Sequence, residues 1–518
     1  MAEITLPTST SSKAARAALI QSFTVERLYG YRTISLASEH AATVLIAKNG
    51  TGKTTLLGAM DAVLKLQLGR LRELPFSVIR LKLRDHDTEL AITHDDVIEH
   101  LRIPDSGEFL KMASRTGLEP TVLFEYITNN AFSFVRDERF NPADRVNSSL
   151  RQAFNYNTAD IEAALEIVRT ELFSRQNNIS LLWKALLSAL KDTEIVYLPT
   201  YRRVELALRE DTSADPYQRR KSPKFAVAAG SLYTGDIQFG LTDIQERLRA
   251  LNSNIIGASN NGYRRISANI INDLLDGSFA QQAYTQEHLP SKEELSLFLS
   301  RIRDGRRTVP YEPISAPHLE KLSETSDMPD ASRQFLYYFL AQLGQVIDAT
   351  KDVEAPVDTF IDMCNKYLQA EEPSTDLPHR GQPLSREDGK ALRLNRRNLR
   401  VHVESLPNGR KISLDALSSG EKQMISLFAK LFLYPKKKIV LIDEPELSLS
   451  IDWQSHILVD VINAPLCEQI IAITHSPFVF ENELDPFALP LQVVIEEPQA
   501  EDSDDGDDFT IGFDDDGE

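Results

Sequence analysis

The stretch from Lys48 to Thr55, Lys-Asn-Gly-Thr-Gly-Lys-Thr-Thr, constrains the fold more than any other part of this 518-residue chain. It follows an apolar, β-branched run, Thr43 to Ala47, that predicts a strand, and it precedes apolar residues at helical spacing. A glycine-rich turn that opens a helix leaves backbone N–H groups free for a phosphate, and the helix dipole adds positive charge there. The stretch therefore predicts a phosphate loop between a strand and a helix of an α/β fold.

The residue types in this phosphate loop suit nucleotide chemistry. Lys53 supplies a mobile cation for the β- and γ-phosphates, and Thr54 supplies a hydroxyl ligand for Mg²⁺. The usual spacing has glycine at position 47, but that glycine opens the loop without contacting phosphate, so Ala47 is compatible with the prediction. A chance glycine-rich turn is the alternative. The remaining candidate nucleotide-binding residues here are Asn49, Gly50, Gly52 and Thr55.

Two carboxylates follow an apolar strand near the end of the chain. The run Ile439 to Ile442 reads as a buried strand, and Asp443 and Glu444 come directly after it. Open α/β sheets bind ligands at the carboxyl ends of their strands. Asp443 is therefore a candidate Mg²⁺ ligand, and Glu444 is a candidate catalytic residue that polarises an attacking water. A plain acidic turn is the alternative.

Two further elements are weak functional signals when taken alone. They become informative because they occur together with the phosphate loop and the two carboxylates. Ser418, Ser419 and Gly420 open an apolar helix and leave N–H groups for an anion, although the same sequence is an ordinary helix N-cap. His475 follows another apolar strand, Gln469 to Thr474, on the same expected sheet edge. A histidine there can contact the γ-phosphate and is the second candidate catalytic residue; alone it would be a turn residue.

These elements occur in the order found in the ATP-binding-cassette (ABC) class of P-loop ATPases, which the chain resembles. More narrowly it is similar to the soluble branch with the SMC-type and OLD-family ATPases. The run Asp443 to Ser450 with Trp453-Gln454, and the run Thr474 to Phe478, resemble ATPases of bacterial anti-phage systems such as the Septu ATPase and its retron-associated relatives. The matched motifs are Walker A (47–55), signature (417–421), Walker B (439–444), D-loop (447–452) and switch histidine (475).

The resemblance implies a head with a parallel core sheet and an antiparallel β lobe. It implies ATP and Mg²⁺ as cofactors and ATP hydrolysis as the activity. Two heads would close on ATP, with Lys53 and Asp443 from one chain and Ser419 and Gly420 from the other, in a homodimer or higher homo-oligomer. Closure would signal to an effector, a separately encoded nuclease, in the cytoplasm. The alternatives are a DNA-repair ATPase that holds DNA itself and a nucleotide-gated scaffold with little turnover.

The interval between the motifs predicts the domain organisation. Thr55 and Leu417 are separated by 416 − 55 = 361 residues, more than a nucleotide-binding head needs, so a helical insertion is expected. We expect a flexible arm (1–20), two head segments (21–240 and 381–496), the helical insertion (241–380) and a disordered acidic tail (497–518). Residues 501–518 hold ten of the acidic residues, and without them the net charge of −19 falls to −9.

Composition excludes several other classes. Two cysteines rule out a disulfide framework and a four-cysteine zinc site, and no apolar run is long enough to span a membrane. Nucleic-acid binding stays open because two arginine groups could contact a phosphate backbone, solvated faces being the alternative. These groups are Arg301, Arg303, Arg306 and Arg307, and Arg393, Arg396, Arg397 and Arg400. Weaker candidates for nucleotide contacts are Arg202, Arg203 and Gln238.

Overall fold

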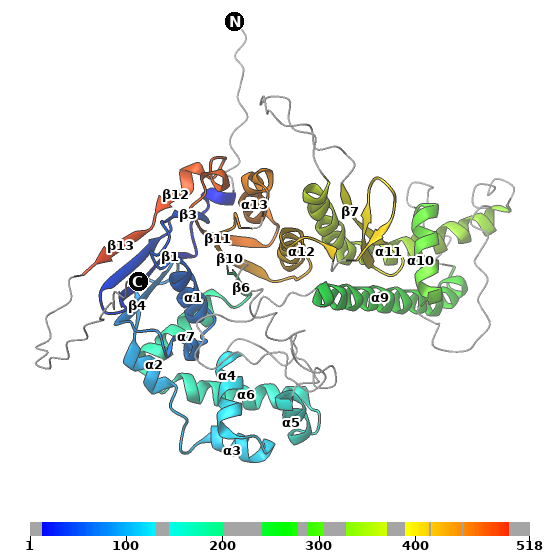
Figure 1. Ribbon diagram of the computed structural model, residues 1–518. Coiled ribbons are helices and arrows are strands. Elements are labelled where there is room, and N and C mark those ends of the chain that lie inside the picture. The colour runs from blue at the N-terminus through cyan, green and yellow to red at the C-terminus, as the bar shows by residue number, and fades with distance from the viewer. Residues whose placement is uncertain are drawn as a thin grey trace, which may run out of the picture.

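The computed structural model describes residues 13–130, 145–199, 241–277, 289–304, 328–369, 389–413, 416–447 and 449–496. These residues form an α/β head built on two five-stranded sheets, from which long helices extend beside a three-stranded sheet (Figure 1). The predicted fold class, a head with a parallel core sheet, an antiparallel β lobe and a helical insertion, is confirmed. The predicted acidic tail lies outside the described residues.

The core sheet has five strands in the order β12-β3-β11-β10-β6, and every neighbouring pair is parallel. Apart from β12, these strands are almost continuous apolar runs, as expected for a sheet covered on both faces. Four of them match strands expected from apolar, β-branched runs, whereas the short β12 was not predicted. The four runs are Thr43 to Ala47, Glu194 to Leu198, Ile439 to Ile442 and Gln469 to Thr474. Their bounds are Ala488–Pro490 (β12), Ala42–Ile46 (β3), Cys467–Thr474 (β11), Lys437–Asp443 (β10) and Thr193–Leu198 (β6).

The register of this sheet brings the predicted motifs to one edge. Ile473 of β11 lies opposite Asp443 of β10 on one side and opposite Leu45 of β3 on the other. Because the three strands are parallel, their carboxyl ends lie together. The phosphate loop, the Asp443-Glu444 pair and His475, which follow these strands, therefore meet at this edge.

Helices cover both faces of the core sheet, and the two faces receive different motifs. Leu441 of β10 belongs to the hydrophobic core that includes α1 (Lys53–Leu64). Its neighbour Val440 belongs to a second core, which includes α12 (Ser419–Phe432) and α13 (Ile451–Asn463). Successive side chains of a strand point to opposite faces. The helix of the phosphate loop and the helix of the signature motif therefore lie on opposite faces of one sheet.

The antiparallel lobe is the second sheet, with the strand order β13-β2-β1-β4-β5. The alternating residues from Val78 to Ile92, with a turn at 84–87, predict a hairpin. This prediction is confirmed, since β4 and β5 pair antiparallel. The edge strand β13 comes from the far end of the chain and was not predicted. The bounds are Gln492–Ile495 (β13), Arg32–Ala37 (β2), Ile20–Leu28 (β1), Val78–Leu83 (β4) and Leu90–Thr93 (β5).

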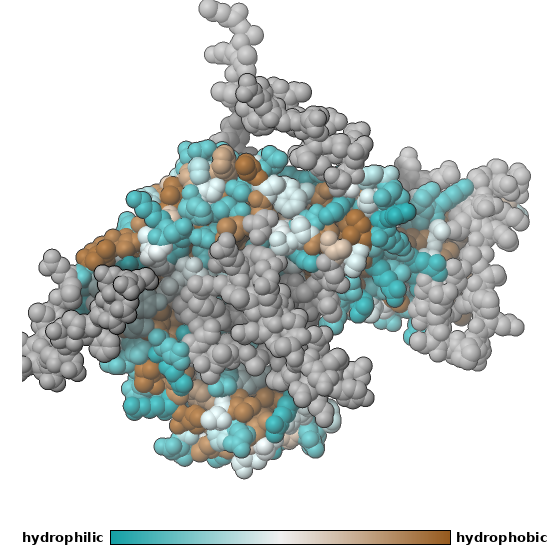
Figure 2. Space-filling model, in the orientation of Figure 1, coloured by the Kyte–Doolittle hydropathy of each residue, from teal (hydrophilic) through white to brown (hydrophobic). Residues whose placement is uncertain are grey.

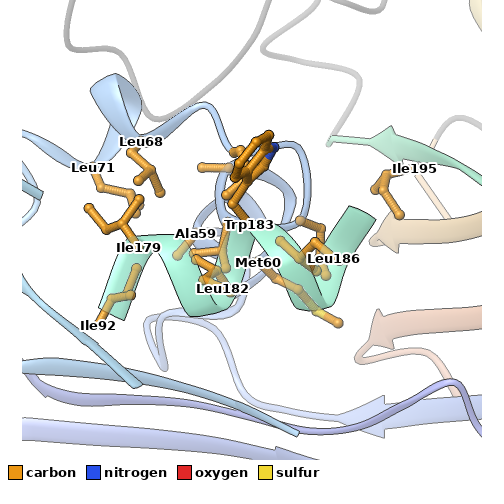
Figure 3. Close-up of a cluster of buried hydrophobic side chains, with 14 of the residues drawn as sticks. Ala59, Met60, Leu68, Leu71, Ile92, Ile179, Leu182, Trp183, Leu186 and Ile195 are labelled. Atoms are coloured by element: carbon orange, nitrogen blue, oxygen red, sulfur yellow. The ribbon is translucent and has the colours of Figure 1, made fainter. Parts of the chain in front are cut away.

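Between β5 and β6, the described residues form six helices, and α7 packs against α1. In Figure 3, Leu182, Trp183 and Leu186 of α7 gather with Ala59 and Met60 of α1 in one apolar cluster. Burying each large side chain contributes roughly 1.5–3 kcal/mol, so this packing fixes the helix that starts at the phosphate loop. The helices are α2 (His94–His100), α3 (Glu108–Thr116), α4 (Pro120–Asn129), α5 (Arg145–Ala153), α6 (Thr158–Phe173) and α7 (Asn177–Ala189).

The predicted helical insertion contains α9 (Leu241–Leu275), α10 (Lys292–Asp304) and α11 (Asp330–Leu368). A separate hydrophobic core joins the three helices, through residues such as Ile266, Phe298 and Leu343. This core is specific to the insertion, whereas other parts of α9 and α11 belong to the second core beside the core sheet, through residues such as Leu248 and Phe360. No helix among the described residues is long and apolar enough to cross a membrane.

The third sheet connects the insertion to α12. Its strands are β7 (Lys390–Asn395), β8 (Arg400–Ser405) and β9 (Lys411–Ile412), in that order and antiparallel. The Asn408-Gly409 pair predicts a hairpin between strands expected at 399–404 and 411–414. The hairpin is confirmed, because β8 and β9 pair antiparallel, and Gly409 takes a φ of 63°, which glycine adopts readily. The strand β7 was not predicted.

Two expectations need correction. The chain is already part of the head at Lys13, where it forms a short 3₁₀ helix and its Nζ donates to the carbonyl oxygens of Asn463 and Ala464, so the predicted arm over 1–20 does not reach residue 20. Arg301 does not belong to an exposed basic group. It is 3% exposed and binds the Glu354 carboxylate and the carbonyl of Arg396. In the part of the chain that the structure describes, the other 3₁₀ helices are Leu68–Leu71, Pro477–Val479 and Asp485–Phe487.

Candidate functional site

The phosphate loop has the backbone that its glycines predict. Gly50 and Gly52 adopt φ angles of 81° and 93°, a region that side chains disfavour. A Cβ at Gly52 would also lie 2.6 Å from Cδ1 of Ile34. Gly52 is the N-cap of α1 and no side chain caps this helix start. The loop thus presents an uncapped helix N-terminus of the kind that binds phosphate.

Lys53 lies at this helix start and is only 5% exposed. Its Nζ donates to Oδ1 of Asn49 at 3.2 Å and to Oε1 of Glu444 at 2.8 Å. A buried ammonium group needs an anionic or polar partner. The Glu444 carboxylate occupies the Lys53 ammonium group in the way that phosphate oxygens would. The ammonium group is therefore positioned to bind an anion.

Arg32 supports the loop from the neighbouring β lobe, and sequence reasoning missed it. Its Nη1 donates to the carbonyl of Gly50 at 2.9 Å, and its guanidinium lies over the Tyr31 ring, 5.2 Å from the centroid. This contact holds the carbonyl group of a residue in the phosphate loop. Nothing in the sequence spacing signals the contact, because it depends on how β2 packs beside the loop.

The two carboxylates at the end of β10 have different surroundings. Asp443 is 2% exposed and lies at the last position of the strand. Glu444 follows with a φ of 52°, a left-handed conformation that costs a glutamate of order 1–3 kcal/mol, and its N–H donates to the carbonyl of Ile473 at 2.8 Å. The left-handed turn directs the chain out of the strand, and the Glu444 carboxylate contacts Lys53.

His475 is anchored by a carboxylate that sequence reasoning did not single out. Its Nδ1 lies 2.8 Å from Oε1 of Glu446 and 3.9 Å from Oε1 of Glu444. Glu446 also accepts hydrogen bonds from the backbone N–H of His475 at 3.1 Å and from Oγ1 of Thr474 at 2.8 Å. The histidine ring therefore stands beside the Lys53–Glu444 pair, and the turn after β10 is bound to the turn after β11.

The signature helix begins elsewhere. Ser418 is the N-cap of α12 and forms a capping box with Glu421, whose carboxylate also binds Nζ of Lys390 at 2.8 and 3.0 Å. Ser418 is exposed, Ser419 is half-buried and Gly420 is buried. Because α12 and α1 lie on opposite faces of the core sheet, these residues are not part of the cluster around Lys53. The ordinary N-cap role, left open above, is present in the structure.

The residues at the edge fit a nucleotide with Mg²⁺. The uncapped start of α1 and the Lys53 cation suit phosphate oxygens. Thr54, in the first turn of α1, and Asp443, at the end of β10, supply a hydroxyl and a carboxylate. Mg²⁺ is typically held by one or two such oxygen ligands together with substrate phosphates. The weaker candidates Arg202, Arg203 and Gln238 lie outside the described residues.

Comparison with known proteins assigns the class. The family model for the AAA ATPase domain matches residues 20–480, so the chain belongs to this family. A comparison with curated proteins gave no match. Among solved structures, the chain aligns with an Smc head domain from Pyrococcus furiosus that has an extended coiled coil and is bound to the C-terminal domain of ScpA. The alignment has a TM-score of 0.30 and 13% sequence identity, and it covers 92% of this chain and 96% of that one.

Proposed function

We propose that this chain binds and hydrolyses ATP as an ABC-type ATPase and acts as a nucleotide-gated switch. One observation carries the proposal: Lys53, Glu444 and His475, which come from three distant parts of the sequence, lie together at the carboxyl edge of the core sheet. Membership of the AAA ATPase domain family supports nucleotide binding.

Binding would use the free N–H groups at the start of α1, with Lys53 at the β- and γ-phosphates. Asn49, Gly50 and Thr55 would line the loop, and Thr54 and Asp443 would hold Mg²⁺. The metal ion, when bound, neutralises charge on the β- and γ-phosphate oxygens. Asn49 already accepts a hydrogen bond from Lys53, so it keeps the ammonium group directed along the loop.

Glu444 changes partner in this scheme. In the structure its carboxylate accepts from Lys53 at 2.8 Å. Phosphate oxygens would compete for that ammonium group, and the Glu444 carboxylate would then be released to polarise a water and accept its proton. His475, beside the same carboxylate, would contact the γ-phosphate and report its presence.

The switch requires a second head. Ser419 and Gly420 lie on the opposite face of the core sheet from α1. Within one chain they would not reach the nucleotide at Lys53, whereas a second copy could present them to it. ATP would therefore close a homodimer or higher homo-oligomer, and hydrolysis would open it.

The biological role we propose is that of a sensor or regulator subunit in a cytoplasmic anti-phage system with a separately encoded nuclease. The support is the resemblance of the runs Asp443 to Ser450 and Thr474 to Phe478 to such ATPases. The alternatives are a DNA-repair ATPase that holds DNA and a scaffold with little turnover. In the basic group on the third sheet, Arg393 binds Glu404 and Arg396 binds Asp358, so these two cations already have anionic partners.

Phosphate release from MgATP by the purified chain, compared with the Lys53→Ala variant, tests the ATPase function. Turnover that depends on Lys53 supports the proposal, and ATP binding without turnover favours the scaffold. Protection of bacteria from phage by the gene with its neighbours, lost in Lys53→Ala, tests the biological role. Salt-dependent DNA binding with no such protection would favour the repair ATPase.

A further inference from the structure

Glu446 makes three side-chain contacts to Thr474 and His475. Its side chain is 5% exposed, and both carboxylate oxygens are engaged. Oε1 faces two nitrogens of His475, the backbone N at 3.1 Å and the ring Nδ1 at 2.8 Å, and Oε2 accepts from Oγ1 of Thr474 at 2.8 Å. All three contacts go to consecutive residues at the end of β11.

These contacts determine how the His475 ring is presented. Carboxylate oxygens accept hydrogen bonds, and one lies 2.8 Å from Nδ1, so we assign the ring proton to Nδ1, toward Glu446. Nε2, on the other edge of the imidazole ring, is then the nitrogen left for a ligand. Which nitrogen of a histidine meets a ligand is commonly set by the hydrogen bond that the other nitrogen makes.

The same contacts join two turns that carry different motifs. Glu446 stands in the turn after β10, three residues beyond Asp443. Gln454 reinforces the connection, because its Nε2 donates to the carbonyls of Glu446 and Leu449, at 3.3 and 3.1 Å, and its Oε1 accepts from Oγ of Ser476 at 3.1 Å. Hydrogen bonds therefore connect the turn after β10 to the turn after β11 on both sides of His475, at Thr474 and at Ser476.

We propose that Glu446 is a positioning residue for ATP hydrolysis: it holds the Nδ1 edge and the backbone of His475, and so presents Nε2 to the phosphate site. The inference rests on the proposed ATPase function. Glu446 does not touch the nucleotide itself; it acts through His475. Its hydrogen-bonding geometry, more than its charge, carries the effect, since the contacts go to two N–H donors and one hydroxyl group.

The test uses two variants of the full chain. Glu446→Ala removes all three contacts and should lower kcat about tenfold, the rate equivalent of one charge-assisted hydrogen bond, with ATP affinity unchanged by calorimetry. Glu446→Gln should keep kcat within about threefold, because its amide oxygen accepts from both His475 nitrogens and its amide N–H donates to the Thr474 hydroxyl. A Gln variant as slow as the Ala variant would overturn the positioning role.

A double mutant separates action through His475 from a general structural effect. His475→Ala should lower kcat by at least as much as Glu446→Ala, and adding Glu446→Ala to it should change kcat less than twofold. Fully multiplicative losses, or an unchanged rate in His475→Ala, would overturn the inference.

Glu354→Ala is the matched control, because it removes a largely buried glutamate that binds Arg301 in the helical insertion. This control should lower the melting temperature and leave kcat unchanged. Loss of kcat equal to that of Glu446→Ala would mean that the effect is not specific to the site. ATP turnover by the unmutated chain and its loss in Lys53→Ala are measured in the same experiment. If the unmutated chain has no turnover, or if Lys53→Ala keeps it, the proposed ATPase function is wrong. If both controls behave as expected and the Glu446 variants do not, only the positioning role is wrong.

Discussion

The helices α1 and α12 both begin at short sequences rich in glycine, serine or threonine, but they begin in different ways. At α1 the N-cap is Gly52, in a left-handed conformation and without a side-chain cap. At α12 the N-cap is Ser418, whose hydroxyl accepts from the N–H of Glu421, and the Glu421 carboxylate accepts from the N–H of Ser418. One helix start is open to an anion and the other is closed by the chain itself.

The difference separates a helix start that needs a ligand from a helix start whose N–H groups are bound by the chain's own side chains. The first N–H groups of a helix have no partner within the helix and need a cap, water or a ligand. At α1 the structure supplies Lys53 and no cap, so a phosphate completes the site. At α12 the capping box provides that partner, and the exposed Ser418 lies on the far side of the core sheet. In the proposed switch, a second chain would bring the two helix starts together.

The largest expected change in turnover comes from Glu444→Gln. This variant also tests whether the start of α1 and the start of α12 of a second chain come together on ATP binding. Gln keeps the shape but cannot accept the proton, so kcat should fall about 10²–10⁴-fold with ATP binding retained. If α12 of a second chain completes the site, this variant should accumulate with ATP as a dimer of doubled mass in light scattering. An equal mass with and without ATP would contradict an ATP-gated pairing of heads.

Lys53→Ala tests the open helix start alone. Removing a charge-assisted phosphate contact should weaken ATP binding about 10- to 150-fold by calorimetry. Lys65→Ala, at the other end of α1 and paired with Asp61, is the matched control and should leave ATP affinity unchanged. Equal affinities for Lys53→Ala and the unmutated chain would remove the basis for the phosphate loop assignment.

Ser419→Arg tests the closed helix start. A large cation at the start of α12 should leave ATP affinity of a single chain unchanged and lower turnover about tenfold or more, because it obstructs a partner's nucleotide. Mixing this variant with Lys53→Ala should restore part of the turnover. In such a mixed dimer one composite site has an intact Lys53 and an intact Ser419. Failure of the mixture to recover any activity would argue against a site shared between chains.

Gly52→Ala and Gly50→Ala compare two positions within the phosphate loop. Both have positive φ, but a Cβ at Gly52 also meets Ile34 at 2.6 Å, whereas nothing lies within 4 Å of a Cβ at Gly50. Gly52→Ala should lower the free energy of unfolding by roughly 1–3 kcal/mol, and Gly50→Ala by roughly 1 kcal/mol. Denaturant unfolding measures both, and the reverse order would contradict the described loop conformation.

The smallest effect is expected at the cap of α12. Ser418→Ala removes one capping hydrogen bond and should lower the free energy of unfolding by about 1 kcal/mol, with ATP affinity of a single chain unchanged. Denaturant unfolding and calorimetry check the two expectations. A weaker ATP affinity in this variant would place Ser418 in contact with the nucleotide of its own chain.

The motifs and the class of fold could be predicted from sequence because they depend on local order. The phosphate loop, the strand before Asp443 and the strand before His475 are each recognisable from a run of fewer than about ten residues. The helical insertion followed from the length between motifs. The strands β12 and β13 were missed because they are short and pair with strands far away in the chain. The strand β7 pairs with the next strand, β8, and was missed because polar and apolar residues are mixed evenly along it.

The sequence by itself determined which residue types are present for nucleotide chemistry and in which order, since glycine backbone freedom, lysine charge and apolar strand runs are local properties. Only the tertiary structure decided which of them meet. Parallel pairing of β3, β11 and β10 brings Lys53, Glu444 and His475 together and adds Glu446. The packing of β2 beside the phosphate loop adds Arg32. No spacing in the sequence indicated Glu446 or Arg32. The alternation of side chains across those strands places α12 on the far face, so the signature residues stay apart from the phosphate loop of their own chain.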